Sequence, residues 1–445
     1  MVWEVSVGKK AMASSCATDP VRRPTIVTFD CPGAVPLFDR TSTAGIGGAE
    51  VRAVTFARFL AQDPRFRVKF VIGAANHVRD DSGAAVEVCC ETADTNRRSP
   101  TRGLATHASR LAAKAVASLT KRALGKPCYQ MFYRRHKTDV LCCFGVTNRT
   151  ASVVRTARQA GCKVIVFVTS DRTLQDVCRR GWNNRGLYGE RGEWCRFSLQ
   201  HADAVVVQKE AQRKALQHSL GIVPSLIRNP IDLDEKNDLP CEISGHVLWI
   251  GRADIDSKRA DLLLEIARRS PQTAFVGIMN VHDRDLYQTL RRTCPANLRI
   301  IEHVPFDKVE SYYRDASVLL NTSNAEGFPN SFLQAAKYGV PIVSLNVDPD
   351  SIIVRYSLGR YCRGRLENAV QAIDEISEAI DTRRNSRTRI QDYVHRYHNV
   401  HDRVRDLQSL IAQVLAGIDS GPVISSGGVS QRLLSASMNR SETCI

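Results

Sequence analysis

The run ASVLLNTSNAEGFPNSFLQAAKYGVPIVSL, residues 316–345, predicts a strand, a turn, a helix and a second strand in quick succession. Residues 316–322 and 340–345 are apolar runs of strand length, and the helical segment between them begins near Pro329. Proline is favoured at the first helical position, where an N–H would have no intrahelical partner. Strand, helix and strand in this order form the unit from which parallel sheets are built. We therefore expect an α/β fold.

The same alternation of short apolar runs and helical segments extends over most of the chain. Because 445 residues exceed what one hydrophobic core usually organises, we expect two doubly wound parallel-sheet domains. The polar stretch from Arg228 to Pro240 has the composition of a hinge between them. The further strand candidates are 24–30, 66–72, 138–144, 163–169 and 203–208 before the hinge, and 246–250, 273–279 and 298–301 after it.

The chain divides into five predicted segments. Residues 386–416 place apolar residues at near-helical spacing, which indicates an amphipathic helix, whereas the Ser- and Gly-rich end of the chain indicates disorder. The segments are a disordered or extended N-terminus at 1–23, domains at 24–232 and 233–385, a helix at 386–418 and a disordered tail at 419–445.

Composition excludes several classes of protein. Apolar residues at 43% and charged residues at 24% are typical of a globular protein, and no apolar run is long enough to cross a bilayer. Residues 1–24 lack the unbroken apolar stretch of a signal peptide, so we expect the protein in the cytosol. There its 14 cysteines should be reduced thiols, and none shows the spacing of a zinc site. We expect no bound metal, and we interpret His395, His398 and His401 as solvated helix or turn residues.

The positive charge is confined to one half of the sequence. Residues 1–225 contain 35 Lys and Arg against 18 Asp and Glu, whereas residues 226–445 contain 27 against 28. Residues 95–138 carry eleven basic residues and no acidic one. We expect this segment to bind the cytosolic membrane face or an anionic lipid-linked acceptor, with a solvated basic face as the alternative. No nucleic-acid-binding module accompanies the charge, so we expect no nucleic-acid partner.

The turn from Ala325 to Ser331 is the first candidate for a binding site. A helix that begins here directs its free N–H groups and positive dipole end into the crevice at the carboxyl edge of the sheet, which suits a diphosphate. Gly327 allows the backbone to approach a ligand closely, and Glu326 can accept hydrogen bonds from sugar hydroxyls. The alternative is an ordinary helix cap with an exposed acid.

Two further clusters are expected near the same crevice. Gly251 and Arg252 end the strand at 246–250, and Lys258 precedes the next helix, so two cations can stabilise a departing nucleoside diphosphate without a metal ion. A solvated helix start is the alternative. The glycine loop Gly45–Glu50 permits close approach to a phosphate, but it does not match the GxGxxG pattern, which argues against a dehydrogenase.

Together these motifs resemble retaining glycosyltransferase family 4, over roughly residues 24–416. The resemblance implies the GT-B fold, in which two Rossmann-like domains face a cleft and a C-terminal helix crosses back to the first domain. The first domain would hold the acceptor and the second the nucleotide sugar. The matching motifs are GIGGAE (45–50), HADAVVVQKEAQRKAL (201–216), IRNPID (227–232), WIGRADIDSKRADLLLEIA (249–267) and NTSNAEGFPNSFLQAAKYGVPIVSL (321–345).

The resemblance also implies roles for individual residues. Arg252 and Lys258 would clamp the donor diphosphate beside Gly251, and Glu326 would contact the transferred sugar. Gly47 and Gly48 would approach the diphosphate from the other domain. The turn would hold the sugar and the phosphate through Gly327, Phe328, Pro329, Asn330 and Ser331.

The chain departs from the family pattern at two positions. Where family members commonly carry a second glutamate that binds the ribose, this chain has Gln334, so we expect altered but retained nucleotide binding. Where many members offer a histidine near the reacting sugar, the chain reads Val168-Thr169-Ser170-Asp171, and Asp171 is the candidate for a positioning role on the acceptor side.

We therefore expect a metal-independent retaining hexosyltransferase that needs no cofactor. It would transfer sugar from a UDP-, GDP- or ADP-sugar to a lipid-linked or glycan acceptor, in cell-surface polysaccharide biosynthesis, and would be cytoplasmic or peripheral on the cytosolic membrane face. The alternatives are a sugar-nucleotide epimerase or phosphorylase on the same fold, and a non-catalytic relative that binds sugar or lipid.

Overall fold

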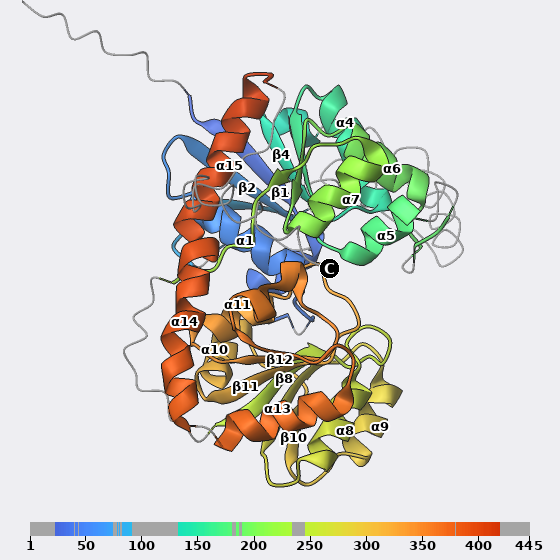
Figure 1. Cartoon of the computed structure of the whole chain (residues 1–445). Helices are drawn as coiled ribbons and strands as arrows, with labels where there is room; N and C mark the ends of the chain where they lie inside the picture. Colours follow the sequence, from blue (N-terminus) through green and yellow to red (C-terminus); the bar gives the residue numbers. More distant parts are fainter. Residues whose placement is uncertain are drawn as a thin grey trace, which may run out of the picture.

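The structure is a computed structural model, and it consists of two α/β lobes connected along one side by a pair of helices (Figure 1). The basic segment 95–138 is described only from Phe132 onward, and both predicted disordered ends lie almost wholly outside the described residues. The described residues are 23–39, 41–42, 44–73, 78, 80, 82–90, 132–179, 184–186, 189–233, 245–378 and 380–418.

The first domain is built on a parallel sheet of seven strands in the order β3-β2-β1-β4-β5-β6-β7. Its helices α1, α4, α5, α6 and α7 are Gly48–Leu60, Asn148–Gln159, Asp171–Arg179, Gly192–Gln200 and Glu210–Leu220, and a 3-10 helix covers Pro32–Leu37. Both faces of the sheet are buried in apolar clusters, as continuous apolar strands require. The strands are β1 Thr25–Asp30, β2 Phe66–Ile72, β3 Val86–Cys90, β4 Val140–Phe144, β5 Lys163–Phe167, β6 Ala204–Val207 and β7 Ser225–Leu226.

The second domain repeats this order in a parallel sheet of six strands, β10-β9-β8-β11-β12-β13. In both sheets the first strand lies in the middle and the chain then builds outward on either side, so the strand order reverses beside it, at β1/β4 and at β8/β11. The strands are β8 His246–Arg252, β9 Phe275–Asn280, β10 Leu298–Ile301, β11 Ala316–Asn321, β12 Ile342–Ser344 and β13 Gly359–Tyr361. The helices α8 to α13 are Ala260–Arg269, Arg284–Arg292, Phe306–Arg314, Asn330–Lys337, Ile352–Arg355 and Leu366–Glu378, and a second 3-10 helix covers Pro349–Ser351.

Ligands of doubly wound sheets bind outside the carboxyl ends of the strands where the strand order reverses.

The strand orders of the two sheets confirm the predicted α/β class with two doubly wound parallel sheets. The predicted domain boundary at residue 233 adjoins residues 234–244, which are outside the described part of the chain, and it stays a prediction.

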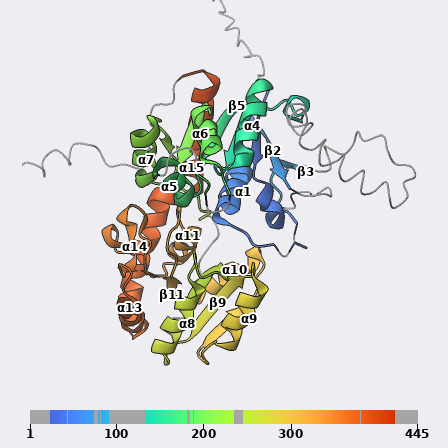
Figure 2. The ribbon, with the colours of Figure 1, turned by 90° about the vertical axis from the view of Figure 1, so that its right-hand side faces the viewer.

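Two helices connect the lobes where the sequence predicts one. α14, Ile380–His398, packs Ile390 and Val394 into the core of the second domain. α15, Val400–Leu415, packs Leu407 and Leu410 into the core of the first. Figures 1 and 2 show the pair running along one side of both lobes.

The predicted continuous helix is interrupted at Asn399, and the hinge sequence explains why. Ile231 donates a backbone hydrogen bond to the His398 carbonyl at 2.9 Å and accepts one from the Val400 N–H at 3.1 Å. These bonds use backbone groups that a continuous helix would pair internally. The Asn399 side chain then caps α15 by accepting a hydrogen bond from the His401 N–H. The predicted crossing back to the first domain is thus present, with a break that the local periodicity did not reveal.

His398 contradicts the interpretation of this histidine as solvated. Its side chain is fully buried at the break, where Nδ1 donates to the Asn229 carbonyl at 2.7 Å and Nε2 accepts from the Tyr393 hydroxyl at 3.1 Å. Burial, with Arg228 and Arg403 nearby, lowers the pKa of His398 well below its usual 6.5. The backbone of the hinge supplied the buried carbonyl that makes this position suitable for a neutral histidine.

We expect the protein to lose stability as the pH falls below about 6.5. His398 then binds a proton in the unfolded chain, whereas the buried imidazole of the folded protein stays neutral. From pH 7.5 to 5.5 this one group should lower the free energy of unfolding by about 1.4 kcal/mol. Denaturant melts of the wild type and of His398→Gln, which keeps a donor and an acceptor without titrating, measure the difference. His401→Gln, at an exposed position, is the control. Equal pH dependence in all three proteins would contradict the assignment.

Most cysteines of the described residues behave as small buried hydrophobes, whereas Cys294 is half-buried. Cys31, Cys142, Cys143, Cys162 and Cys362 are free thiols with buried side chains. Burial raises the pKa of Cys162 and of Cys362 to about 11, which keeps both thiols protonated and unreactive. In the part of the chain that the structure describes, no helix has both the length and the apolar character needed to cross a bilayer.

Candidate active site

The second domain holds its two predicted cations at the end of β8. Asp254 accepts hydrogen bonds from the Ser257 and Lys258 N–H groups, both at 2.7 Å, and its other oxygen lies 3.3 Å from Arg252 Nε. The loop after the strand is thereby folded back over the strand end. Gly251 is required here, because an added Cβ would lie 2.8 Å from the Trp249 ring. Arg252 and Lys258 therefore belong to one compact loop at the carboxyl edge of the sheet.

Lys258 and Glu326 meet above the two central strands of the second sheet. The Lys258 ammonium forms an ion pair with Glu326 Oε1, and Ser323 donates its hydroxyl to the same oxygen at 2.8 Å. Thr322, just after β11, donates to the Lys258 carbonyl at 2.7 Å. The two charged side chains are 23% and 17% exposed, so both remain reachable from solvent. Residues predicted on separate motifs are thus in direct contact at the switch point between β8 and β11.

The predicted turn leads directly into α11. Pro329 is the N-cap and Asn330 the first helical residue, one position from the sequence prediction. Phe328 and Pro329 are buried and Ser331 is half-buried. The Asn330 side chain donates to the Gly48 carbonyl at 2.9 Å and accepts from the Asn229 amide at 2.7 Å. Asn330 therefore bridges the second domain to the glycine loop of the first and to the hinge.

The glycine loop of the first domain lies against the second domain. Gly47 is the N-cap of α1 and Gly48 its first residue, and no side chain caps the helix. An added Cβ on Gly48 would lie 3.3 Å from Asn330 Nδ2, and one on Gly45 the same distance from Asn280 Cβ, at the end of β9. Only small residues allow the loop this close. The uncapped end of α1 thus faces the same region as Glu326 and Lys258.

Asp171 is engaged by its own domain. As the first residue of α5, it forms an ion pair with Lys209 and accepts a hydrogen bond from the Gln212 amide at 2.9 Å. Burial raises the pKa of the Asp171 carboxyl, against the opposing effect of Lys209. The Lys209 ammonium also donates to the Glu326 carbonyl at 3.3 Å, across the domain boundary. Asp171 is therefore joined to the turn of Glu326 through Lys209.

Sequence reasoning missed Lys209 and a second group at the switch point of the first sheet. There Asp30 ends β1 with only 3% of its surface exposed, forms an ion pair with Arg149 and lies 3.4 Å from the Tyr133 hydroxyl. The available signal was the same in both cases. A charged residue ends a buried strand or lies two positions beyond its end, and at a carboxyl strand end such a residue marks a candidate site.

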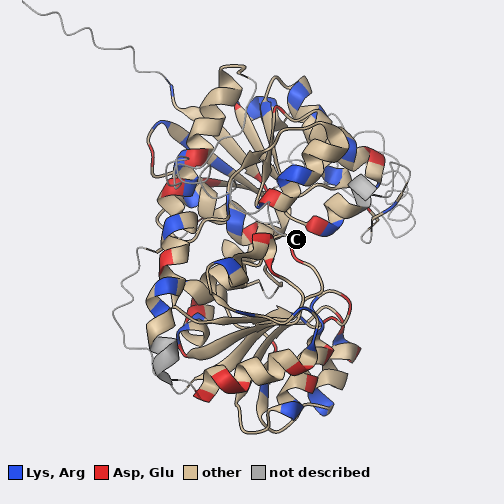
Figure 3. Cartoon of the chain, in the orientation of Figure 1, with Lys and Arg blue, Asp and Glu red and all other residues tan. Residues whose placement is uncertain are grey.

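A cluster of charged and polar residues among the described residues lies apart from this site. Glu87, Cys89 and His136 have ligand atoms within 4.8 Å of one another, but Lys69 Nζ lies 3.2 Å from both His136 Nδ1 and Glu87 Oε1. We therefore interpret the cluster as an ion-paired network rather than a metal centre. Lys, Arg, Asp and Glu are otherwise dispersed over both lobes (Figure 3).

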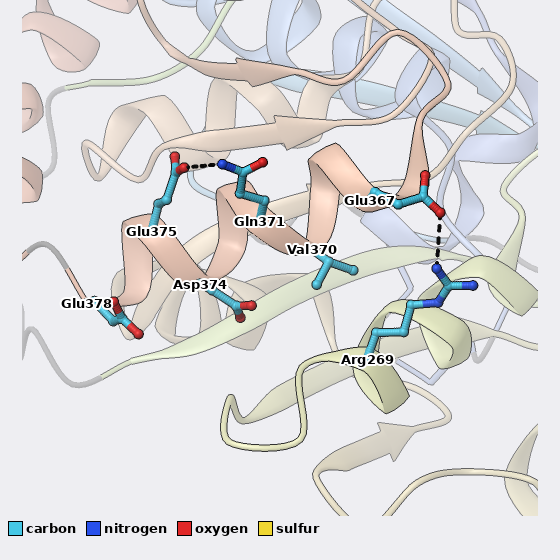
Figure 4. Close-up of a pocket in the computed structure, with 7 residues that line it drawn as sticks. All are labelled: Arg269, Glu367, Val370, Gln371, Asp374, Glu375 and Glu378. Atoms are coloured by element: carbon cyan, nitrogen blue, oxygen red, sulfur yellow. Dashed lines mark hydrogen bonds and ion pairs between the residues drawn. The ribbon is translucent and has the colours of Figure 1, made fainter.

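The groove in Figure 4 is separate from the predicted residues. It encloses about 520 Å³ on the second domain and contains no residue of the candidate site. Its walls come from the end of α8 and from α13, whose side chains there are largely acidic. The lining residues are Arg269, Glu367, Val370, Gln371, Asp374, Glu375 and Glu378.

Comparison with known proteins identifies the type of domain. Residues 244–382 match the family described as glycosyl transferases group 1. No curated protein matches the chain by sequence.

Solved structures extend the similarity over the whole fold. Sucrose-phosphate synthase from Thermosynechococcus elongatus aligns with a TM-score of 0.66 and 14% identity, over 88% of this chain and 99% of that one. WaaG, a glycosyltransferase involved in lipopolysaccharide biosynthesis, aligns with a TM-score of 0.60 and 12% identity, over 86% and 99%. A TarM mutant from S. aureus, in complex with Fondaparinux, alpha-GlcNAc-glycerol and UDP, aligns with a TM-score of 0.53 and 14% identity, over 64% of this chain.

The present chain spans 58% of the length of that TarM chain. At these identities the comparisons establish the fold, which is GT-B. The resemblance predicted from the motifs is confirmed in fold, and residues 244–382 match the model of the predicted family.

Proposed function

We propose that this chain, whose residues 244–382 belong to the glycosyl transferases group 1 and whose fold is GT-B, is a retaining glycosyltransferase. Its donor is a UDP-, GDP- or ADP-sugar, and its acceptor is a glycan or a lipid-linked glycan of cell-surface polysaccharide synthesis. One observation supports the proposal above the others. Lys258 and Glu326 are brought together at the switch point of the second sheet, beside the N-terminus of α11 and opposite the glycine loop.

The geometry suits the departure of a nucleoside diphosphate. The bond between the anomeric carbon and the donor phosphate oxygen breaks, and the same carbon forms a bond to the acceptor oxygen. The acceptor proton passes to the leaving phosphate, so no redox partner is required. Arg252, Lys258 and the helix end stabilise the negative charge that grows on this phosphate. An ammonium has three donors, so Lys258 can hold a phosphate oxygen while it keeps Glu326 in place.

Glu326 contributes to positioning of the sugar rather than to nucleophilic attack. Its carboxylate is held by Lys258 and Ser323, and its remaining acceptor sites can bind sugar hydroxyls. Holding the sugar in one orientation relative to the acceptor supplies much of the rate enhancement in reactions between two bound substrates.

Gln334 is the proposed contact for the ribose. Its side-chain oxygen, one turn into α11, is buried and has no hydrogen-bond partner among the described residues. An unpartnered buried oxygen is costly, and a ribose hydroxyl would satisfy it.

We expect Gln334→Ala to weaken the binding of UDP or its GDP and ADP counterparts about tenfold, because one hydrogen bond of about 1.4 kcal/mol is lost. Titration calorimetry measures the Kd. Inorganic pyrophosphate, which has no ribose, serves as the matched ligand and should bind both proteins equally. An equal loss for both ligands would place Gln334 at the phosphates instead.

The proposed function is tested with a panel of nucleotide sugars. We expect one donor to raise the melting temperature, and that donor to be hydrolysed slowly or transferred, with the anomeric configuration retained by NMR of the product. Because Arg252 and Lys258 would stabilise the leaving phosphate in place of a metal ion, turnover should persist in excess EDTA. A non-catalytic sugar-binding protein would bind a donor without turnover, and an epimerase would return an altered nucleotide sugar.

The basic segment 95–138 remains the proposed membrane or acceptor contact. It rests on the eleven basic residues without an acidic one. Sedimentation with anionic and neutral vesicles tests it, since equal binding to both kinds, or binding to neither, would argue against the proposal.

A further inference from the structure

Lys209 occupies the point where the two domains touch beside Glu326. It follows β6 as the N-cap residue of α7 and is only 6% exposed. Its ammonium is shared between the Asp171 carboxylate of its own domain and the Glu326 carbonyl of the other. A buried ammonium needs a charged partner, which Asp171 provides. The first domain therefore fixes the ammonium N–H of Lys209 that donates to the Glu326 carbonyl.

The neighbouring turn is packed against the same loop. Gln208 donates its side-chain amide to the Val168 carbonyl at 3.0 Å. A Cβ on Gly327 would lie 2.9 Å from that amide nitrogen. The residue that follows Glu326 thus lies directly against the turn that carries Lys209, with no room for a side chain between them.

The second domain in turn caps α7. Lys209 is the N-cap residue of α7, but its side chain forms no capping hydrogen bond with the helix. Instead Asp350 accepts hydrogen bonds from the Glu210 N–H at 2.8 Å and the Ala211 N–H at 3.2 Å. Its carboxylate also lies 3.8 Å from Arg228 in the hinge. Because the cap comes from the other domain, the orientation of α7 and of Lys209 depends on how the domains are closed.

We propose that Lys209 is a positioning residue of the transfer reaction, which sets the turn of Glu326 against the sugar when the domains close. The inference rests on the proposed function and gives a role to a residue for which none of the motifs predicted one. Lys209 holds the backbone of Glu326, and the Glu326 carboxylate is held by Lys258 and Ser323. The carboxylate is held within the second domain, whereas the backbone of Glu326 is held only while the domains are in contact.

The role of Lys209 differs from that of the phosphate cations. Arg252 and Lys258 belong to the second domain and hold their loop without help from the first. Removing Lys209 should therefore leave nucleoside diphosphate binding intact while the sugar loses its orientation. Misplacement by about 1 Å can lower a rate about 100-fold.

The test compares Lys209→Met with Lys69→Met. Both lysines lie in the first domain, both side chains are 8% exposed, and both are ion-paired, but Lys69 pairs with Glu87 away from the candidate site. For each variant we would measure kcat with the donor found above, the Kd for the nucleoside diphosphate, and hydrogen exchange of the backbone amides in residues 323–328.

We expect Lys209→Met to lower kcat about 100-fold, to change the Kd less than about threefold, and to accelerate exchange in residues 323–328. Lys69→Met should lose comparable stability without these effects. Equal losses of kcat in the two variants, or unchanged exchange in the loop, would overturn the proposal. If the wild type turns over no donor, the proposed function fails. Hydrogen exchange in Lys209→Met then decides whether Lys209 positions the loop. Unchanged exchange would overturn this positioning role, and faster exchange would support it.

Discussion

Lys258→Met should reduce kcat by about 10²- to 10³-fold while the protein remains folded, because it removes a preorganised cation from the departing phosphate. The substitution leaves the stem of the side chain in place and removes only the charge. Glu326 then loses one partner but keeps the Ser323 hydroxyl and access to solvent. A partly exposed ion pair contributes little to stability, so the melting temperature should fall by no more than a few degrees.

The measurement is steady-state kinetics beside a thermal melt. Lys163→Met is the matched control, because Lys163 is also partly exposed and pairs with a carboxylate, Asp203, at 3.1 Å. It should melt like Lys258→Met and retain full activity. A stability loss for Lys258→Met as large as that of a core cavity would make Lys258 a structural residue, and an unchanged kcat would remove it from the reaction.

Gly327→Ala should strongly reduce the rate of transfer through one added methyl group. An added Cβ would overlap the Thr169 carbonyl oxygen of the first domain and would lie 2.9 Å from Gln208 Nε2. A backbone carbonyl cannot rotate away as a side chain does, so the domains must separate. Lys209 would then lose its hydrogen bond to Glu326. We expect a loss of about 100-fold or more in kcat, with the Kd for the nucleoside diphosphate almost unchanged.

Gly277→Ala provides the comparison for this prediction. Its added methyl group would lie 3.0 Å from a Leu263 methyl group, a flexible side chain within the second domain. Overpacking of this kind costs stability, about 1–3 kcal/mol, without moving one domain against the other. If Gly327→Ala closed normally in small-angle scattering and kept its kcat, the close approach of the turn to Thr169 would be irrelevant to the reaction.

The central strands of both sheets could be predicted because each is a continuous apolar run. Residues 163–169 and 246–250, for example, become β5 and β8 almost as expected. The strands β3, β7 and β13 escaped prediction. β7 has only two residues and β13 three, and the apolar run of β3 is interrupted by Glu87. The loop clusters at Lys258 and Glu326 were predictable because turn chemistry and strand ends are local properties of the sequence.

The contacts between the domains could not be predicted in this way. Lys209 and its Glu326 partner are separated by 117 positions, and Glu210 and Asp350 by 140. No local pattern pairs them. His398 shows the same limit, because its helical surroundings suggested exposure while the hinge backbone, from the other side of the domain boundary, buried it.

The break at Asn399 restricts how the two lobes can move apart. The polypeptide passes between the lobes twice, at the hinge and at the break, and backbone hydrogen bonds tie the two passages together at Ile231. Two tethers side by side favour bending of the lobes about an axis through this point over sliding. We therefore expect any gap between the lobes to widen with distance from α14 and α15.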